Sequence, residues 1–181
     1  MQLNELRTFL LEHGVSLEKW GTGTAKTLEH LLREIQQEEA LLTPISGWIF
    51  RRVSVSAVSI FCHRDNRLLR LEEETQRFQD GRVRIRDLAS SISEKIKLRE
   101  IPEAAAHRAI VEELGIKETL QLEKRGIQKK GPTPSASYPS LFTLYTIHYF
   151  ETFLPSHLYA PRYTERQDDK ITIFVWKEFE G

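Results

Sequence analysis

The feature that most constrains the fold is a short helical pattern, Pro102 to Gly115, which interrupts a long stretch of β-patterned sequence. Proline suits the first turn of a helix, and glycine suits the position just past its last turn, so these two residues mark the helix ends. Strand patterns precede this helix from Arg51 and follow it from Leu141. One helix between runs of strands predicts an α+β domain.

The strand patterns predict strands that differ in how far their two faces are buried. The run "RRVSVSAVSIF" alternates, "HRDN" forms a polar turn, and "RLLRLEE" continues as the second strand of a hairpin. The run "LFTLYTIHYF" is apolar on both faces and predicts a central, well-covered strand, while "ITIFVW" predicts a last strand. Glycine and prolines in "KKGPTPSASYP" predict a loop.

Two helices are expected before this body. Apolar residues recur at helical spacing from Leu3 to Glu12, where Gly14 stops the pattern. A second stripe lies between Thr27 and Pro44. Its members are Leu28, Leu31, Leu32, Ile35 and Leu42. We therefore expect an N-terminal helical extension over residues 1–44 and an α+β domain over residues 45–181.

Composition limits the classes of partner. The 181 residues contain 26 basic and 26 acidic side chains, so no net charge draws the chain to nucleic acid or to an anionic membrane, although local patches remain open. The single cysteine, Cys62, excludes an internal disulfide. The sequence starts without a basic and then apolar leader, and no apolar run approaches the roughly 20 residues of a membrane span. These features predict a soluble, cytoplasmic protein.

Two adjacent acids, Glu112 and Glu113, lie near the end of the central helix. With successive residues about 100° apart, they share a sector with Ala109, and an acid at 109 would lie between them. Such a trio of carboxylates could hold Mg²⁺, which favours carboxylates, water and phosphate oxygens. The helix dipole disfavours acids at this end, which suggests a functional role for the pair. The alternative is a solvated face on which Arg108 pairs with Glu112.

The segment "SEKIKLREIPEAAAHRAIVEELGI", Ser93 to Ile116, resembles the Nudix box. That box consists of Gly, five residues, Glu, seven residues, Arg-Glu, an aliphatic residue, any residue, Glu-Glu, any residue, Gly and an aliphatic residue. The matching positions here are Glu100, Arg108, Ile110, Glu112, Glu113, Gly115 and Ile116, and Lys95 stands where many members have a lysine. The resemblance implies a Nudix-like mixed β-sheet sandwiched with helices.

Two positions depart from the box. Glu94 replaces the leading glycine, and Ala109 replaces one of the three glutamates that usually bind metal in the family. The resemblance implies that Glu112 and Glu113 bind Mg²⁺ or Mn²⁺, that Glu94 or Glu100 supplies the missing carboxylate or acts as general base, and that Arg108 holds an acid in place. The function so implied is hydrolysis of a nucleoside diphosphate-linked substrate, with weak or altered metal-dependent activity.

Two alternatives remain open. The fold can survive without catalysis, so that the old pocket binds a nucleotide, RNA or a protein. The match can also be coincidental in another α+β domain, since short motifs have false positives. Both the hydrolase and the fold without catalysis are expected to bind a phosphate-bearing small molecule. A helical extension is also compatible with a homodimer.

Residues that would select a substrate lie outside the box. Lys129 and Lys130 could contact a phosphate, and Tyr138 could stack on a base. Tyr159 and Tyr163 are further candidates, although burial at loop edges is commoner for tyrosine. The glycines of "KWGTGTAKT" lack the spacing of a phosphate-binding loop, so there we expect turns and a threonine that caps the next helix.

Overall fold

The computed structural model describes residues 1–86 and 88–180, which form two compact units. The first unit comprises Met1–Val55, Lys95–Glu100 and Ile127–Ile147, and the second comprises Ser56–Glu94, Ile101–Gly126 and His148–Gly181. The first unit therefore contains the two N-terminal helices together with strand segments from beyond residue 45. The predicted domain boundary at residue 45 stays a prediction.

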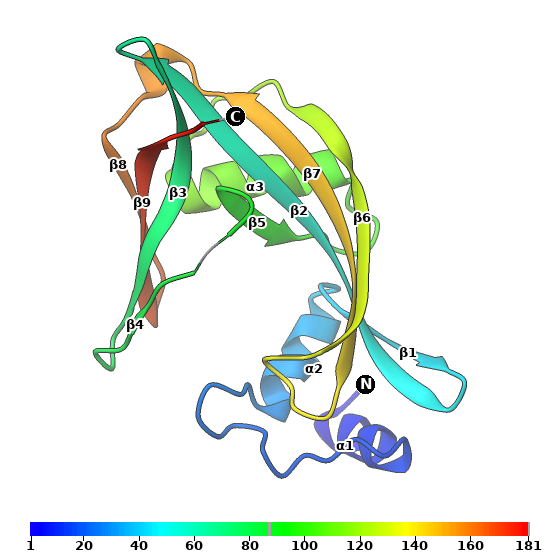
Figure 1. Ribbon diagram of the computed structural model, residues 1–181. Coiled ribbons are helices and arrows are strands. Elements are labelled where there is room, and N and C mark those ends of the chain that lie inside the picture. Colours follow the sequence, from blue (N-terminus) through cyan, green and yellow to red (C-terminus); the bar gives the residue numbers. More distant parts are fainter. Residues whose placement is uncertain (87, 181) are drawn as a thin grey trace. The chain divides into compact units, whose positions relative to one another are not determined.

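The α+β class is confirmed (Figure 1). The helices are α1 (Leu3–Glu12), α2 (Leu28–Gln36), α3 (Pro102–Leu114) and the short 3₁₀ helix η1 (Ser156–Leu158). The strands are β1 (Leu41–Ile45), β2 (Trp48–Arg64), β3 (Arg67–Phe78), β4 (Val83–Arg84), β5 (Ile92–Lys95), β6 (Glu123–Pro134), β7 (Phe142–Phe153), β8 (Arg162–Arg166) and β9 (Lys170–Glu178). Their order is β6-β7-β2-β3-β9-β8, with β1 and β5 paired to β2 and β4 paired to β3.

Local sequence explains the predicted elements. Asp65 and Asn66 both have positive φ and turn β2 back into β3, as a tight hairpin turn requires. Pro102 opens α3, and Gly115 closes it in the left-handed conformation at φ 71°. Thr27 caps α2, since its Oγ1 accepts a hydrogen bond from the backbone N–H of His30.

The second helix is shorter than its apolar stripe predicted. The helix α2 ends at Gln36, Glu38 follows with φ 61°, and Leu42 lies on β1 opposite Arg51. Leu42 still packs against the core of the first unit. The stripe therefore identified residues that pack in the core of the first unit, but not the element that carries Leu42, because strand pairing with β2 competes with the helix there.

The predicted loop at Lys129–Pro139 is also partly wrong, because β6 extends to Pro134. It ends the path of paired strands, and its side chains are mostly exposed. Edge strands tolerate glycine, proline and lysine, the residues that resembled a loop. Gly131 has φ 113°, and a Cβ there would lie 2.5 Å from the Thr143 carbonyl oxygen, so this glycine permits close approach to the chain at residue 143.

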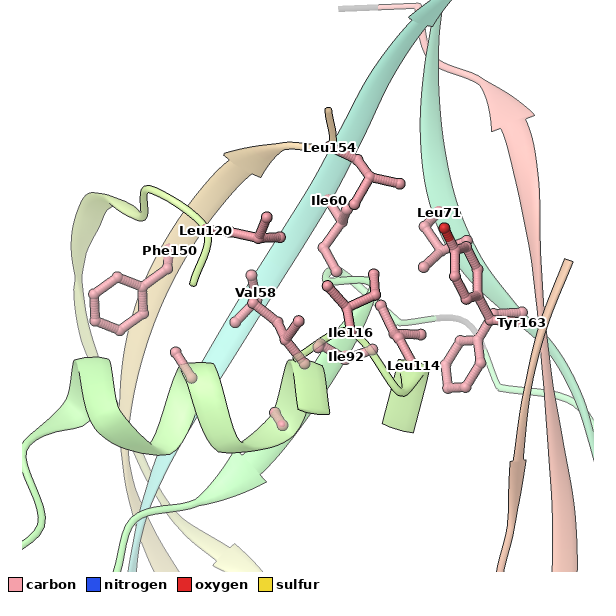
Figure 2. Close-up of a cluster of buried hydrophobic side chains, with 14 of the residues drawn as sticks. Val58, Ile60, Leu71, Ile92, Leu114, Ile116, Leu120, Phe150, Leu154 and Tyr163 are labelled. Carbon is pink, nitrogen blue, oxygen red and sulfur yellow. The ribbon is translucent and has the colours of Figure 1, made fainter. Parts of the chain in front are cut away.

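Each unit has its own apolar cluster. In the first, Leu6, Leu10, Leu28 and Leu31 of the helices pack with Ile49, among others. In the second, one side of α3 packs on residues of β2, β3, β7 and β9 (Figure 2). Cys62 is buried there, as expected for a lone thiol. None of the helices within the described ranges has the length and apolar run that a bilayer span requires.

Candidate functional site

A polar cavity of about 180 Å³ lies in the second unit. Four glutamates and two cations are among its lining residues: Glu73, Glu94, Glu113, Glu165, Arg86 and Lys170. The acids come from β3, β5, α3 and β8, so the fold gathers them from distant parts of the sequence (Figure 1). So many carboxylates around one cavity repel one another unless a cation or a proton compensates them.

Strand geometry directs Glu73 into the cavity. Glu73 is in phase with the buried Leu71, and the register of β3 on β9 shifts just after it, between Glu73 and Thr75, so that Gln76 also lines the cavity. The Glu73 side chain is 2% exposed and forms a two-point pair with Arg86, whose Nε lies 2.8 Å from Glu73 Oε1 and whose Nη2 contacts Oε2. Gln76 Nε2 also donates to Glu73 Oε2, at 3.3 Å. This pairing raises the pKa of Arg86, which therefore stays charged.

Glu113 is the electrostatically strained member of the group. Its half-buried carboxyl has a pKa raised well above the usual range, first by desolvation and then by the charges of Glu165 and Glu94. Arg86 opposes this shift, and Glu73 adds to it. A residue with such a shift in a cleft is a candidate for function, because a bound cation would relieve the repulsion.

Arg108 lies between Glu94 and Glu112. Its Nη1 is 3.5 Å from Glu94 Oε1 and 3.7 Å from Glu112 Oε2. Arg108 thus contacts Glu94, which also lines the cavity. Glu112 has a 53% exposed side chain and is not among the lining residues. The two box glutamates therefore face different surroundings.

The helical wheel placed Ala109 between Glu112 and Glu113, but the three positions do not share one polar face, because Glu112 is exposed and Glu113 is half-buried. Ala109 is fully buried with Ala106 and Ile110 in the apolar cluster. Alanines at 105, 106 and 109 are all buried and widen the buried side of α3. Because their side chains are small, they let the helix pack closely. Ala109 therefore makes an apolar contact in this cluster.

The remaining predicted site residues lie in the first unit, outside this cavity. Glu100 Oε2 accepts a hydrogen bond from the backbone N–H of Lys97, at 2.9 Å. Lys129 and Lys130 are exposed on β6. Tyr138 is fully buried, with its ring 5.0 Å from that of Trp20, so it has no exposed surface on which a base could stack.

The other two tyrosines considered belong to the second unit. Tyr163 is 8% exposed, and its hydroxyl donates to the Leu158 carbonyl at 2.7 Å. The ring of Tyr159 stacks on Trp176 at 5.7 Å and lies beneath the guanidinium of Arg64. Both rings thus have partners within the protein.

Sequence reasoning missed Glu73, Arg86 and Glu165. A usable pattern existed for the acids: Glu73 is in phase with Leu71, and Glu165 is in phase with Tyr163, both of which are buried. An acid at an inward position of a strand is costly unless it has a partner. No comparable pattern identifies Arg86. Within residues 1–86 and 88–180, no group of three or more His, Cys, Asp or Glu side chains is already arranged to hold a metal ion.

No family model and no curated protein matches the chain. Similar solved structures include the NUDIX domain of Shewanella oneidensis NrtR complexed with ADP ribose, at 9% identity over 70% of this chain and 73% of that one, with a TM-score of 0.38. A MutT/nudix family protein from Enterococcus faecalis is 14% identical over 82% of this chain and 58% of that one, with a TM-score of 0.40. The T. brucei MERS1–RNA complex is 15% identical over 85% and 53%, with a TM-score of 0.41.

The chain thus spans little more than half the length of the last two proteins. Two of the three structures are named as Nudix proteins, the family whose box Ser93–Ile116 resembles. With TM-scores of 0.38 to 0.41, the match is a likeness of fold and assigns no activity, substrate or partner to this chain.

Proposed function

We propose that this chain is a Nudix-like hydrolase of a nucleoside diphosphate-linked substrate, with an altered site for Mg²⁺ or Mn²⁺. The observation that supports this proposal most is the set of four glutamates around one cavity, with Glu113 half-buried among them. A protein gains nothing in stability from such repulsion, so a ligand that compensates it is the simplest explanation.

The residue types of the cavity suit a hard cation, although no three acids of the described ranges are arranged to hold one as they stand. Glu94, Glu113 and Glu165 offer carboxylate oxygens, which Mg²⁺ prefers together with water and phosphate oxygens. We assign Glu113 and Glu94 as the acids of the box segment that would hold the ion. Glu112 instead forms an ion pair with Arg108, and Arg108 in turn restrains Glu94. When bound, the ion would neutralise charge on the phosphate oxygens and would favour loss of a proton from the attacking water.

The reaction is attack of water on one phosphorus of the diphosphate, with cleavage of the bridging P–O bond and release of a proton. A carboxylate of the cavity accepts that proton. Lys170 lines the same cavity and can attract an anionic substrate. The polar lining suits a phosphate group better than an apolar ligand.

The test is hydrolysis of a panel of nucleoside diphosphate derivatives, ADP-ribose included, with Mg²⁺ and Mn²⁺. Glu113→Gln should lower kcat by about 100-fold or more, because it removes the central ligand charge. Glu112→Gln is the matched control from the neighbouring position, and it should retain most of the activity. Equal turnover in wild type and Glu113→Gln would contradict the proposal.

A second candidate function is favoured by the Arg86–Glu73 pair. The guanidinium sits in the cavity and already neutralises one acid, as expected of a site that no longer needs a metal. The protein would then bind a nucleotide, RNA or another protein without turnover. A thermal shift with phosphate-bearing ligands, in the absence of metal-dependent hydrolysis, would support this function over the first.

A further inference from the structure

A flat surface made by Phe78 and Arg82 lies at the turn that joins β3 to β4, and we call it the stacking platform (Figure 1). The guanidinium of Arg82 lies over the Phe78 ring, 4.9 Å from its centroid. Arg82 Nε also donates to Asp80 Oδ2 at 2.7 Å, so two partners hold the guanidinium in place. The Arg82 side chain is nevertheless 56% exposed. A planar group can therefore stack on its open side.

Strand register places the stacking platform next to the cavity. Phe78 follows Gln76 by two positions on β3, so both side chains point to the same face of the sheet. Gln76 lines the cavity, and so does Lys170, the register partner of Phe78 on β9. The two turns at this end are also joined, because the backbone N–H of Gln79 donates to the Asp169 carbonyl at 3.0 Å. The stacking platform therefore adjoins the cavity at the end of β3.

A row of polar side chains runs beside the stacking platform and into the cavity. Arg84 of β4, Gln76 of β3 and Thr172 of β9 are successive register partners, and opposed residues on paired strands point to the same face. Thr172 lines the cavity and is 1% exposed, and its Oγ1 forms no hydrogen bond with any described residue. Buried hydroxyls usually have a partner, so this one indicates an acceptor or a donor bound in the cavity.

Two cations near this row indicate the charge of the ligand. Arg86 is already paired with Glu73. Lys170 and Arg84, by contrast, form no ion pair with residues 1–86 or 88–180, although four acids line the cavity. Cations that are free of the neighbouring acids can hold the oxygens of an anionic group, and phosphate oxygens are strong acceptors for both side chains.

We propose that the stacking platform binds the base of a nucleotide whose phosphates enter the cavity. The base stacks on Arg82, above Phe78, while Arg84 and Lys170 contact the phosphates. Side chains two positions apart on a strand are about 7 Å apart, which is within the span of one nucleotide. This inference rests on the proposed function and deepens it, because it assigns recognition of the base to residues outside the box segment.

The experiment compares the binding of AMP and ribose 5-phosphate, which differ by the base and contain no diphosphate that could be cleaved. Calorimetry gives both affinities. The wild type should bind AMP at least tenfold more tightly, because stacking on a base is favourable whatever its identity. Phe78→Leu and Arg82→Gln should each remove most of this preference and leave the affinity for ribose 5-phosphate unchanged. Arg84→Gln should weaken the binding of both ligands severalfold.

The matched control for Arg84→Gln is Arg77→Gln. Arg77 is exposed and lies between Gln76 and Phe78 on β3, so its side chain points to the opposite face. This variant removes the same charge and should leave both affinities unchanged. Phe78→Leu retains an apolar side chain at a half-buried position, and thermal unfolding checks that it folds.

The outcomes separate this inference from the proposed function. If the wild type bound AMP no more tightly than ribose 5-phosphate, or if Phe78→Leu and Arg82→Gln both kept the preference, the stacking platform would be overturned. Hydrolysis that depends on Glu113 would still support the proposed function in that case. A preference that both variants abolish, without hydrolysis of any diphosphate derivative, would support the platform and contradict the hydrolase. Equal weakening by Arg77→Gln and Arg84→Gln would overturn the assignment of Arg84.

Discussion

At the scale of single residues, burial distinguishes two alanines of the same helix. Ala109 is fully buried in the apolar cluster of the second unit, whereas Ala104 is exposed near the start of α3. The box pattern alone suggests that an acid restored at 109 would rebuild the usual metal site. The packing indicates instead that a carboxylate there would enter an apolar environment, which strongly disfavours its charge.

We therefore expect Ala109→Glu to lower the free energy of unfolding by more than about 3 kcal/mol. Ala104→Glu introduces the same side chain on the same helix and should change stability by about 0.5 kcal/mol or less. Urea denaturation of the two variants measures both effects. If Ala109→Glu were as stable as Ala104→Glu and bound Mn²⁺ more tightly than wild type, the carboxylate would reach the cavity, and our account of α3 would be wrong.

The candidate site was only partly predictable from residues close in sequence. Glu94 and Glu113 were identified because both lie in one recognisable segment, and both line the cavity. Glu73 and Glu165 were not, since strand register brings them there over long sequence separations. Tyr138 was a candidate for stacking on a base, but its ring packs in a core that the sequence did not reveal.

At the scale of elements, capping residues predicted α3 well, and turn residues predicted the β2–β3 hairpin. The failures occurred where one composition suits two structures. The lysines, glycines and prolines of β6 suit a loop or an edge strand, and the leucine stripe after Thr27 suits a helix or a short strand. Only pairing partners from elsewhere in the chain decide between them.

One buried ion network holds α2 within the first unit. Glu34 of α2 is 4% exposed and is surrounded by three cations. Arg51 Nη2 lies 2.6 Å, Lys95 Nζ 3.0 Å and Lys26 Nζ 2.9 Å from its carboxylate oxygens. Burial alone would raise its pKa, but the three cations more than offset this and lower the pKa to about 2.

This network predicts a loss of stability in acid. Because the folded pKa is lower than the usual 4.5, the unfolded chain binds the proton more readily. The ionised Glu34 therefore contributes roughly 3 kcal/mol to the free energy of unfolding. This contribution is complete above about pH 5 and is lost as the pH falls toward 2. Urea unfolding from pH 2 to 7 measures it. Glu34→Gln should flatten this part of the profile and lower stability at neutral pH, because Arg51 and Lys26 lose their counter-charge and Lys95 keeps only Glu39.

The control for this experiment is Glu12→Gln, which changes an exposed acid on α1. It should leave the pH profile as in wild type. A Glu34→Gln profile with the same slope as wild type between pH 2 and 5 would show that other carboxylates account for the acid sensitivity.

At the scale of the whole molecule, the two units differ in what their buried residues do. The cluster of the first unit joins α1 and α2 to Ile49 of β2 and to Leu141, and the residues of the candidate cavity all lie in the second unit. Each cluster contains large side chains that are fully buried, among them Leu10 in the first and Ile110 in the second. Each unit thus has a buried core of its own, and we expect it to unfold locally as a separate cooperative unit.

We expect core truncations to act on one unit at a time. Leu10→Ala and Ile110→Ala each remove a buried aliphatic side chain, at a cost of about 2–5 kcal/mol. Hydrogen exchange followed peptide by peptide should show lost protection in α1 and α2 for Leu10→Ala, and in α3 and β9 for Ile110→Ala. Each variant is the control for the other. If both variants released both sets of amides equally, the chain would open as a single cooperative unit, and the cavity could not keep its geometry independently of the N-terminal helices.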